Sequence, residues 1–300
     1  MIIARYGGAK EPSNSVKPRV GNDCFSDGPD FMLSVIDIQP GDAPLIVNVP
    51  HDGREIPAEI GATMTAEALA LPDTDWHIRD LYAFAAELGA TITSARYSRY
   101  VVDLNRDPAG KSFYPGADTT EVCPTSTFHR EPIYGGGQEP DAAEIERRLD
   151  LYWHSYHVEL AKVIAEQRDR HGAVLLFDAH SIGSELPRFF EGRLPDFNLG
   201  TADGASADNV VTDRMFDVLN RADDYTATLN GRFKGGYITR HYGNPDGGVH
   251  AIQLEMAQVA YMDEGAPYRF RPDLADRVRP VLHDLLSSGL DWVREQSRAG

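Results

Sequence analysis

Cysteine is scarce in this sequence, and the motifs built on it are absent. The 300 residues contain two cysteines, Cys24 and Cys123, and no CxxC pair. The two could form one disulfide bond, but they define neither a disulfide framework nor a cysteine-based zinc site. Such sparing use of cysteine is typical of a reducing compartment.

Long apolar runs and a basic surface are lacking as well. No apolar segment approaches the ~18 residues of a transmembrane helix, and the opening MIIARYGGAKEPSNS lacks the apolar core of a signal peptide. Acidic residues outnumber basic ones by 46 to 29, which gives a formal charge of −17. Because such a surface repels nucleic acid and anionic membranes, we expect neither as a partner. The sequence predicts a cytoplasmic protein and leaves its oligomeric state open.

Several familiar catalytic motifs are missing too. The chain has no HExxH, GxSxG, GxGxxG or P-loop sequence. Their absence argues against a zincin protease, a serine hydrolase with a nucleophile elbow and a nucleotide-binding enzyme.

What the chain does have is an alternation of apolar strands with amphipathic helices. We predict strands at 31–37, 44–50, 90–95, 100–104, 173–180, 225–230 and 250–256, helices at 73–89, 141–171, 207–222 and 272–297, and an irregular insertion at 107–138. This order favours an α/β fold with a largely parallel sheet. We expect residues 1–40 to be a peripheral N-terminal extension and residues 41–300 to form one catalytic domain.

Polar side chains stand where several of these strands end. They are His51 after 44–50, Asn105 and Arg106 after 100–104, Asp178 and His180 at the end of 173–180, and Glu255 within 250–256. In open parallel sheets, ligands bind beyond the carboxyl ends of the strands. We therefore expect these side chains to gather at one edge of the sheet.

Two histidines and a carboxylate at one sheet edge indicate a divalent metal site. Imidazole and carboxylate suit zinc, which keeps three protein ligands and one open position in catalytic sites. The candidate ligands are His51, His180 and Asp75, because Asp75 opens the helix that follows the His51 loop. Asp73 is nearly as plausible an acidic ligand. Each residue also has an ordinary structural alternative, such as a histidine in a loop or an aspartate capping a helix.

Glu255 and Asp178 have further roles around such a site. A glutamate inside an apolar strand needs a partner or a function, so Glu255 is predicted to be the general base toward the attacking water. Asp178 is predicted to orient a histidine ligand. The glycine-rich segment 235–248 is interpreted as a flexible loop presenting Arg240 and His241, with an ordinary connection as the alternative.

The chain resembles the N-formylglutamate amidohydrolase family. The resembling segments run in the family's order from about residue 44 to 260: VNVPHDGREIP, DTDWHIRDLY, YSRYVVDLNRDP, CPTSTFHREPIY, FDAHSI, FNLGTADGASAD and GGYITRHYG…HAIQLEM. The resemblance implies a three-layer α/β/α fold with a mixed eight-stranded sheet, like that of zinc-dependent exopeptidases. It also implies a metal hydrolase of histidine catabolism, with one divalent ion, zinc by default. The substrate would be the small dicarboxylate N-formyl-L-glutamate, cleaved to formate and L-glutamate.

The resemblance also implies roles for individual residues. By this likeness, His51, His180 and either Asp75 or Asp73 resemble metal ligands, Glu255 the catalytic glutamate, Asn105 and Arg106 a pair that grips a substrate carboxylate, Arg240 a second carboxylate clamp, and His241 or His250 a stabiliser of the oxyanion. Asp52 departs from the family pattern, in which Ser or Ala often follows the histidine. Two alternatives stay open: a deacylase of another N-acyl amino acid, and a non-catalytic small-molecule binder on the same fold.

Overall fold

The computed structural model describes residues 34–113 and 116–297. The strands are β1 (Ile36–Gln39), β2 (Leu45–Val49), β3 (Thr91–Ala95), β4 (Val174–Ile182), β5 (Phe197–Gly200), β6 (Ala227–Leu229) and β7 (Val249–Ala257). The α-helices are α1 (Ala58–Gly61), α2 (Ala66–Leu69), α3 (Ile78–Leu81), α4 (Ala142–Arg148), α5 (Ser155–His171), α6 (Asn209–Asn220), α7 (Tyr237–Tyr242) and α8 (Pro272–Ser297). Short 3-10 turns are η1 (Ala83–Ala86), η3 (Ala202–Gly204), η4 (Pro245–Gly247) and η5 (Gln258–Ala260), and η2 (Leu149–His154) is π-helical.

The strands form one mixed sheet in the order β1-β3-β2-β4-β7-β5-β6. The central strands β3, β2, β4 and β7 are parallel, whereas β1 pairs with β3 and β5 pairs with β7 in antiparallel fashion. This confirms the predicted α/β class with a largely parallel sheet. The described residues form seven strands, one fewer than the resemblance implies.

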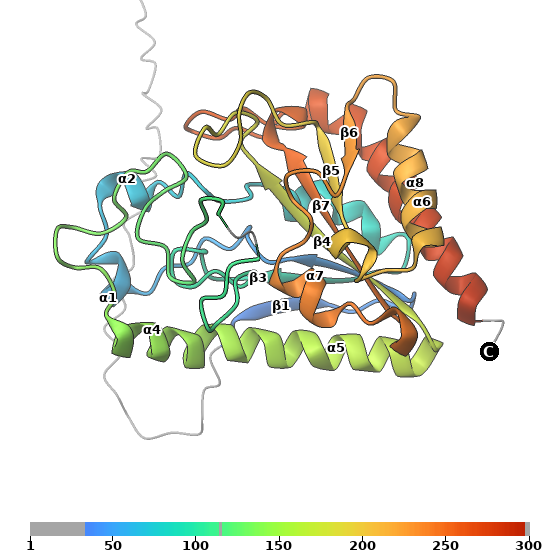
Figure 1. Ribbon diagram of the computed structural model, residues 1–300, viewed down its shortest axis with the longest axis horizontal. Helices are drawn as coiled ribbons and strands as arrows, with labels where there is room; N and C mark the ends of the chain where they lie inside the picture. Colours follow the sequence, from blue (N-terminus) through green and yellow to red (C-terminus); the bar gives the residue numbers. More distant parts are fainter. Residues whose placement is uncertain (1–33, 114–115, 298–300) are drawn as a thin grey trace, which may run out of the picture. The chain divides into compact units, whose positions relative to one another are not determined.

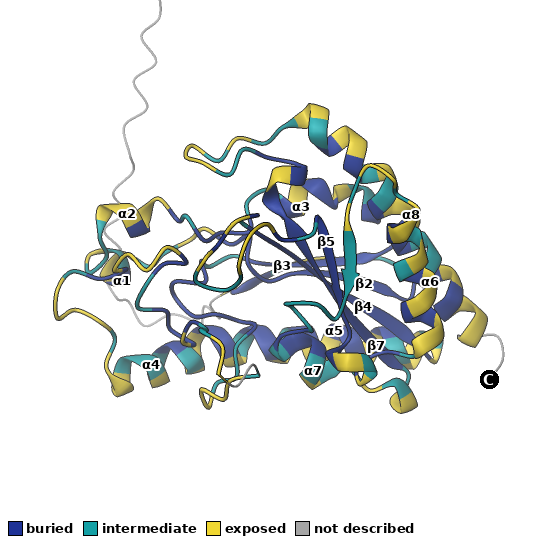
Figure 2. Ribbon diagram, turned by 45° about the horizontal axis from the view of Figure 1, so that its top comes forward, coloured by how far each residue is buried: buried dark blue, intermediate teal, exposed yellow. Residues whose placement is uncertain are grey.

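Helices cover both faces of the sheet and make three layers (Figure 1). In β2, Val47 packs in the core that contains α6 and α8, and its neighbour Ile46 packs in the core beneath α5. Phe177 and Leu176 alternate in the same way in β4. Figure 2 shows the central strands buried between these helices, whose outer faces are exposed. Because both faces of the central strands are covered, they are apolar throughout, as is typical of parallel sheets.

Most of the predicted elements are confirmed. These are the strands at 44–50, 90–95, 173–180, 225–230 and 250–256, and the helices at 141–171, 207–222 and 272–297. The edge strand predicted at 31–37 is β1, which is shifted toward Gln39. Residues 1–33 of the predicted N-terminal extension, including Cys24, lie outside the described residues. Among the described residues, no helix is both long and apolar enough to cross a membrane.

The continuous helix predicted at 73–89 is wrong. Only α3 and η1 form there, because His77, just before α3, has a left-handed backbone with φ of 64°. A helix cannot run through such a residue. Asp73 and Asp75 therefore lie in the turn before the helix, and their side chains are used elsewhere.

The strand predicted at 100–104 is also wrong. In its place the chain runs irregularly, and the Asp103 amide donates to Val122 O at 2.7 Å. The Arg148 guanidinium donates to the carbonyls of Tyr100 and Val101 at 3.4 and 3.3 Å. Side-chain donors thus satisfy backbone groups that a β ladder would otherwise satisfy.

The segment predicted as a glycine-rich loop at 235–248 contains the short helix α7 and the turn η4. Arg240 and His241 both lie on α7. The segment is therefore more ordered than the sequence suggests, and the helix fixes which way its polar side chains point.

Candidate metal centre and active site

Parallel strands deliver the candidate residues to one edge of the sheet. His51 comes two residues after β2, and β4 itself carries Asp178 and His180. Glu255 lies on β7 in direct register with His180. The expectation that these side chains gather at one place therefore agrees with the topology.

Three buried donor atoms face one another at this edge. His51 Nδ1 and His180 Nδ1 are 3.2 Å apart, and Asp75 Oδ2 lies 3.8 Å from the first and 3.2 Å from the second. These three residues form a group whose ligand atoms could hold a metal ion. Each is at most 3% exposed, so no bulk water offsets the crowding of their lone pairs.

Each histidine has a carboxylate behind it. His51 Nε2 lies 2.8 Å from Asp103 Oδ1, and His180 Nε2 lies 2.9 Å from Asp178 Oδ2. Burial opposes the charged form of Asp103, but His51 and Arg106 hold the pKa of its carboxyl well below the usual value. Because an ionised carboxylate only accepts hydrogen bonds, His51 Nε2 carries the proton that it donates to Asp103. Such carboxylate–histidine pairs orient ring nitrogens toward metals.

Asp75 is held in place by a buried cation. Arg99 Nη2 donates to Asp75 Oδ1 at 2.8 Å, which leaves Oδ2 facing the histidines, where the Ser181 amide also donates to it at 3.0 Å. Burial opposes ionisation, but Arg99 keeps the pKa of Asp75 below its usual value. Asp73 instead accepts hydrogen bonds from the Tyr100 hydroxyl and the Phe128 amide. Of the two aspartates that the sequence left open, the structure brings Asp75 to the histidines.

The electrostatic surroundings of His51, Asp75 and His180 favour a positive charge among their donor atoms. Burial alone would lower the pKa of His180, but Asp178 and Asp75 raise it well above the usual range. Burial and Arg99 lower the pKa of His51, which favours the neutral ring, and a ring that donates from Nε2 to Asp103 presents a lone pair at Nδ1. A divalent cation fits this arrangement, because two imidazole nitrogens and a carboxylate oxygen are the donors that zinc and similar ions prefer.

Glu255 lines a pocket that opens beside the donor atoms. Its side chain is 7% exposed, and burial raises the pKa of its carboxyl to about 7. Gln253, two residues earlier on β7, donates from Nε2 to Glu255 Oε2 at 3.2 Å. A carboxylate whose pKa lies near neutrality is suited to accept and return a proton.

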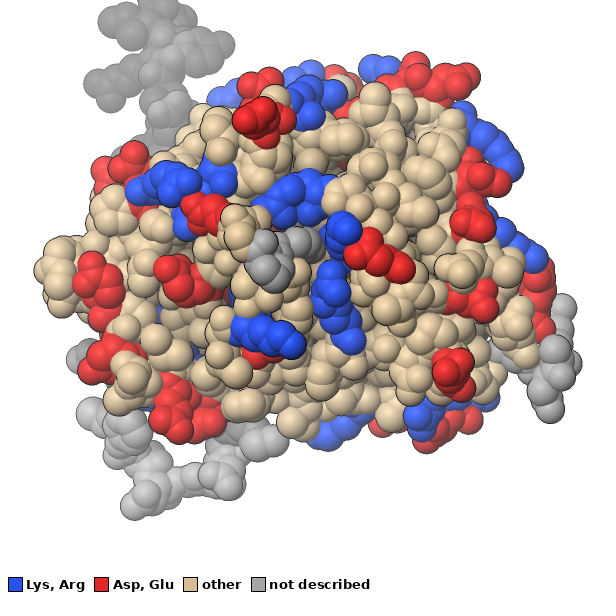
Figure 3. Space-filling model, viewed as in Figure 1, with Lys and Arg blue, Asp and Glu red and all other residues tan. Residues whose placement is uncertain are grey.

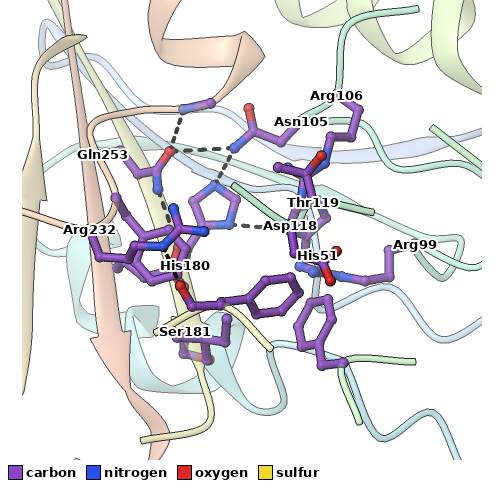
Figure 4. Close-up of a pocket in the computed structure, with 16 residues that line it drawn as sticks. His51, Arg99, Asn105, Arg106, Asp118, Thr119, His180, Ser181, Arg232 and Gln253 are labelled. Carbon is purple, nitrogen blue, oxygen red and sulfur yellow. Dashed lines mark hydrogen bonds between the residues drawn. The ribbon is translucent and has the colours of Figure 1, made fainter. Parts of the chain in front are cut away.

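The same pocket is rich in arginine. Arg99, Arg106 and Arg232 all line it, together with the aromatic rings of Phe128, Phe189 and Phe233. Figure 4 shows Arg106 and Arg232 on different sides of His180. Figure 3 shows basic side chains gathered near the centre of one face of this acidic protein. Local arginines thus offset the negative charge of the whole chain where an anionic ligand would enter.

Asn105 and Arg106 lie together at the pocket, as predicted. Asn105 Oδ1 accepts from the Ile238 amide at 2.8 Å, and its Nδ2 lies 3.0 Å from His180 Nε2. Arg106 donates from Nη2 to Thr120 Oγ1 at 3.1 Å. A Cβ added to Gly236 would lie 2.5 Å from the Asn105 amide group, so only glycine allows this close approach.

Arg240 and His241, predicted to bind substrate, both lie on α7. Arg240 donates from Nε to Gly235 O at 2.9 Å, and its guanidinium lies 5.4 Å from the Phe113 ring centre. His241 stacks on Tyr237 with ring centres 4.7 Å apart. Neither belongs to the described lining of the pocket, where Arg232 stands instead. His250 packs against Trp292 and is also outside this lining.

Four residues of the site escape notice in the sequence: Arg99, Asp103, Arg232 and Gln253. Some of them leave a signal there. Gln253 lies two positions before Glu255 on β7, which is the spacing of one strand face, and Asp103 lies two positions before Asn105 in the sequence. For Arg99 and Arg232 we find no local pattern that singles them out from the other arginines of the chain.

Known proteins resemble this chain over most of its length. The sequence model of a family described as N-formylglutamate amidohydrolase matches residues 43–262. Proteins named N-formylglutamate deformylase from Pseudomonas aeruginosa and Pseudomonas putida are 49% and 45% identical, each over 88% of this chain and 99% of the relative. A crystal structure of N-formylglutamate amidohydrolase from Ralstonia eutropha JMP134 superposes with a TM-score of 0.72 at 25% identity, covering 89% of this chain and all of the other.

Proposed function

Because this chain belongs to the N-formylglutamate amidohydrolase family, we propose that it is a metal-dependent hydrolase that converts N-formyl-L-glutamate and water to formate and L-glutamate. The observation that carries the proposal is the convergence of His51 Nδ1, Asp75 Oδ2 and His180 Nδ1 beside the buried Glu255. The names of the two Pseudomonas relatives, which match nearly end to end, support the choice of substrate.

His51, Asp75 and His180 are the residues that would hold the metal. A divalent ion bound there would act as a Lewis acid on the formyl oxygen and would acidify water, with zinc as the default choice. Around this position the chain contributes fixed groups. Asp103 and Asp178 orient the two rings, and Arg99 keeps Asp75 ionised.

The arginines of the pocket would bind the two carboxylates of the substrate. Arg106, with Asn105 beside it, is assigned to the α-carboxylate, and Arg232 to the side-chain carboxylate. A guanidinium can grip a carboxylate with two parallel hydrogen bonds, which fixes orientation as well as charge. Two such anchors would hold the formyl group still beside Glu255, and this removes much of the entropic cost of reaction.

Glu255 moves the proton. Its carboxylate accepts a proton from the attacking water as the water oxygen bonds to the formyl carbon. The C–N bond then breaks, and Glu255 returns the proton to the leaving nitrogen of glutamate. Gln253 holds one oxygen of Glu255, so that the carboxylate faces the pocket in a fixed orientation.

The setting of this reaction is also part of the proposal. The family resemblance favours a step of histidine catabolism. The scarcity of cysteine and the buried Cys123 thiol favour the cytoplasm.

Formate release from N-formyl-L-glutamate, measured beside elemental analysis of the purified protein, tests the function directly. We expect about one divalent ion per chain and turnover that stops when the ion is removed. N-acetyl and N-succinyl amino acids serve as comparison substrates. Preference for one of those would favour a different deacylase, and stoichiometric metal without turnover of any of them would favour a binding protein.

A further inference from the structure

Three consecutive backbone carbonyls around the Asn105–Arg106 pair are each held by a donor from another element. His157 Nε2 donates to Leu104 O at 2.9 Å, and Trp153 Nε1 donates to Arg106 O at 3.2 Å. Between them, the Tyr237 amide donates to Asn105 O at 3.2 Å. This irregular segment has no strand partner, so these bonds fix its path.

Two of the three donors come from the long helix that runs from α4 through η2 into α5. Trp153 is 4% exposed and His157 is 7% exposed, and their rings lie 3.9 Å apart. Upstream on the same helix, Arg148 reaches the carbonyls of Tyr100 and Val101. One helix therefore holds both ends of the segment 100–106.

A regular α-helix could not present these side chains on one face. Arg148 and Trp153 are five residues apart, which in an α-helix puts them about 140° apart around the axis. In a π-helix, residues five apart are hydrogen-bonded neighbours and share a face. The π turn η2 (Leu149–His154) begins directly after Arg148 and contains Trp153. It is the feature that turns both groups toward residues 100–106.

We propose that Trp153 and His157, brought into line by the π turn, are positioning residues for the carboxylate clamp of Asn105 and Arg106. The inference rests on the proposed function only for the identity of the ligand. Asn105 touches His180, and Arg106 lines the pocket, so the path of their backbone sets where a carboxylate can bind. Without the two donors, the clamp loses its alignment. The proposed metal ligands His51, Asp75 and His180 lie outside the segment 100–106, and Asp103 keeps its own backbone bond to Val122 O.

The first test removes one hydrogen-bond donor at a time and keeps either an aromatic ring or a side chain of similar volume at that position. Trp153→Phe removes the indole N–H, His157→Leu removes the imidazole, and His157→Gln keeps an N–H at a similar position. We expect Trp153→Phe and His157→Leu to raise the Kd for L-glutamate, measured by calorimetry, and the KM by about fivefold to tenfold. We expect kcat and metal content to change less than twofold, and His157→Gln to recover most of the loss. Trp292→Phe, at a buried tryptophan beside His250, is the matched control.

A double-mutant cycle distinguishes positioning from general stability. If Trp153 acts through Arg106, Trp153→Phe costs affinity in the wild type but less than twofold in an Arg106→Ala background. An equal loss in both backgrounds would overturn the proposal. So would a wild type that binds no L-glutamate, whereas absence of formate release with intact L-glutamate binding would overturn the proposed function alone.

Discussion

His51 Nδ1 and His180 Nδ1 lie 3.2 Å apart, although the two residues are separated by 129 positions in the chain. The opposite nitrogen of each ring faces a carboxylate, Asp103 in one case and Asp178 in the other. Two ring nitrogens that meet in this way, beside the oxygen of Asp75, form a cluster that is stabilised when a cation lies among them.

Removal of the metal should therefore destabilise the fold as well as stop turnover. We expect a chelator to lower Tm by about 5 °C or more, since a tightly bound ion stabilises only the folded state. Differential scanning calorimetry with and without added zinc measures this. A Tm that is unchanged by chelation, in protein shown to be metal-free, would contradict the site.

Asp103→Asn should weaken metal binding although it replaces none of the three proposed metal ligands. An amide can donate to His51 Nε2, which would move the ring proton to Nδ1, where the metal needs a lone pair. We expect affinity in a chelator competition assay to fall about 10- to 100-fold. Asp37→Asn, at a half-exposed carboxylate paired with Arg79, should leave metal affinity unchanged. Equal affinities for both variants would argue against the carboxylate–histidine pairing.

Glu255→Gln should separate metal binding from catalysis. The amide has nearly the same shape but cannot accept and return a proton, so we expect kcat to fall by about 10² or more with metal content retained. Steady-state formate release together with elemental analysis measures both. If turnover is unchanged, Glu255 does not carry the proton.

We expect substitutions of Arg232 and Arg240 to have different effects on KM. Arg232→Ala should raise KM for N-formyl-L-glutamate about tenfold or more, because a charge-assisted contact to the side-chain carboxylate is lost. The same variant should change KM little for N-formyl-L-glutamine, which lacks that charge. Arg240→Ala should change either KM less than about twofold. The reverse ranking would restore the prediction made from the sequence.

His157 should make the fold sensitive to acid. Burial lowers the pKa of its imidazole from 6.5 to about 3, so between these values the unfolded chain binds a proton that the folded chain does not. The contribution of His157 to the free energy of unfolding is then complete above pH 6.5 and is lost as the pH falls toward 3. The loss is about 1 kcal/mol between pH 6.5 and 5.5. Urea unfolding at several pH values measures this. His157→Gln should show a shallower fall, and an identical slope would exclude His157 as the source.

The sequence was most informative where strands are buried. Apolar runs ending in His51 or His180 predicted both the strands and the edge at which their polar residues meet, because parallel strands share that edge. The choice between Asp73 and Asp75 could not be made in the same way. It depends on a turn that His77 closes with a left-handed backbone, and on where Arg99 reaches.

The arginines show the limit of local patterns more clearly. Arg240 follows a glycine-rich stretch and was predicted to be a second carboxylate clamp, and in the structure its side chain donates to Gly235 O and lies against Phe113. Arg232 lines the pocket instead, from the connection after β6. The π turn is likewise invisible to a search for helical spacing, since apolar residues on both sides of it fit a regular helix.

The register between β4 and β7 places His180 directly opposite Glu255. Neighbouring residues of a strand point to opposite faces, so a one-residue insertion or deletion in either strand would send one of the two side chains into the packed interior. The loops around the pocket can vary without moving these strands, but the spacing between the proposed metal ligand His180 and the proposed base Glu255 cannot change unless two central strands are rebuilt. Among related proteins, we therefore expect the preferred substrate to vary more readily than the type of reaction.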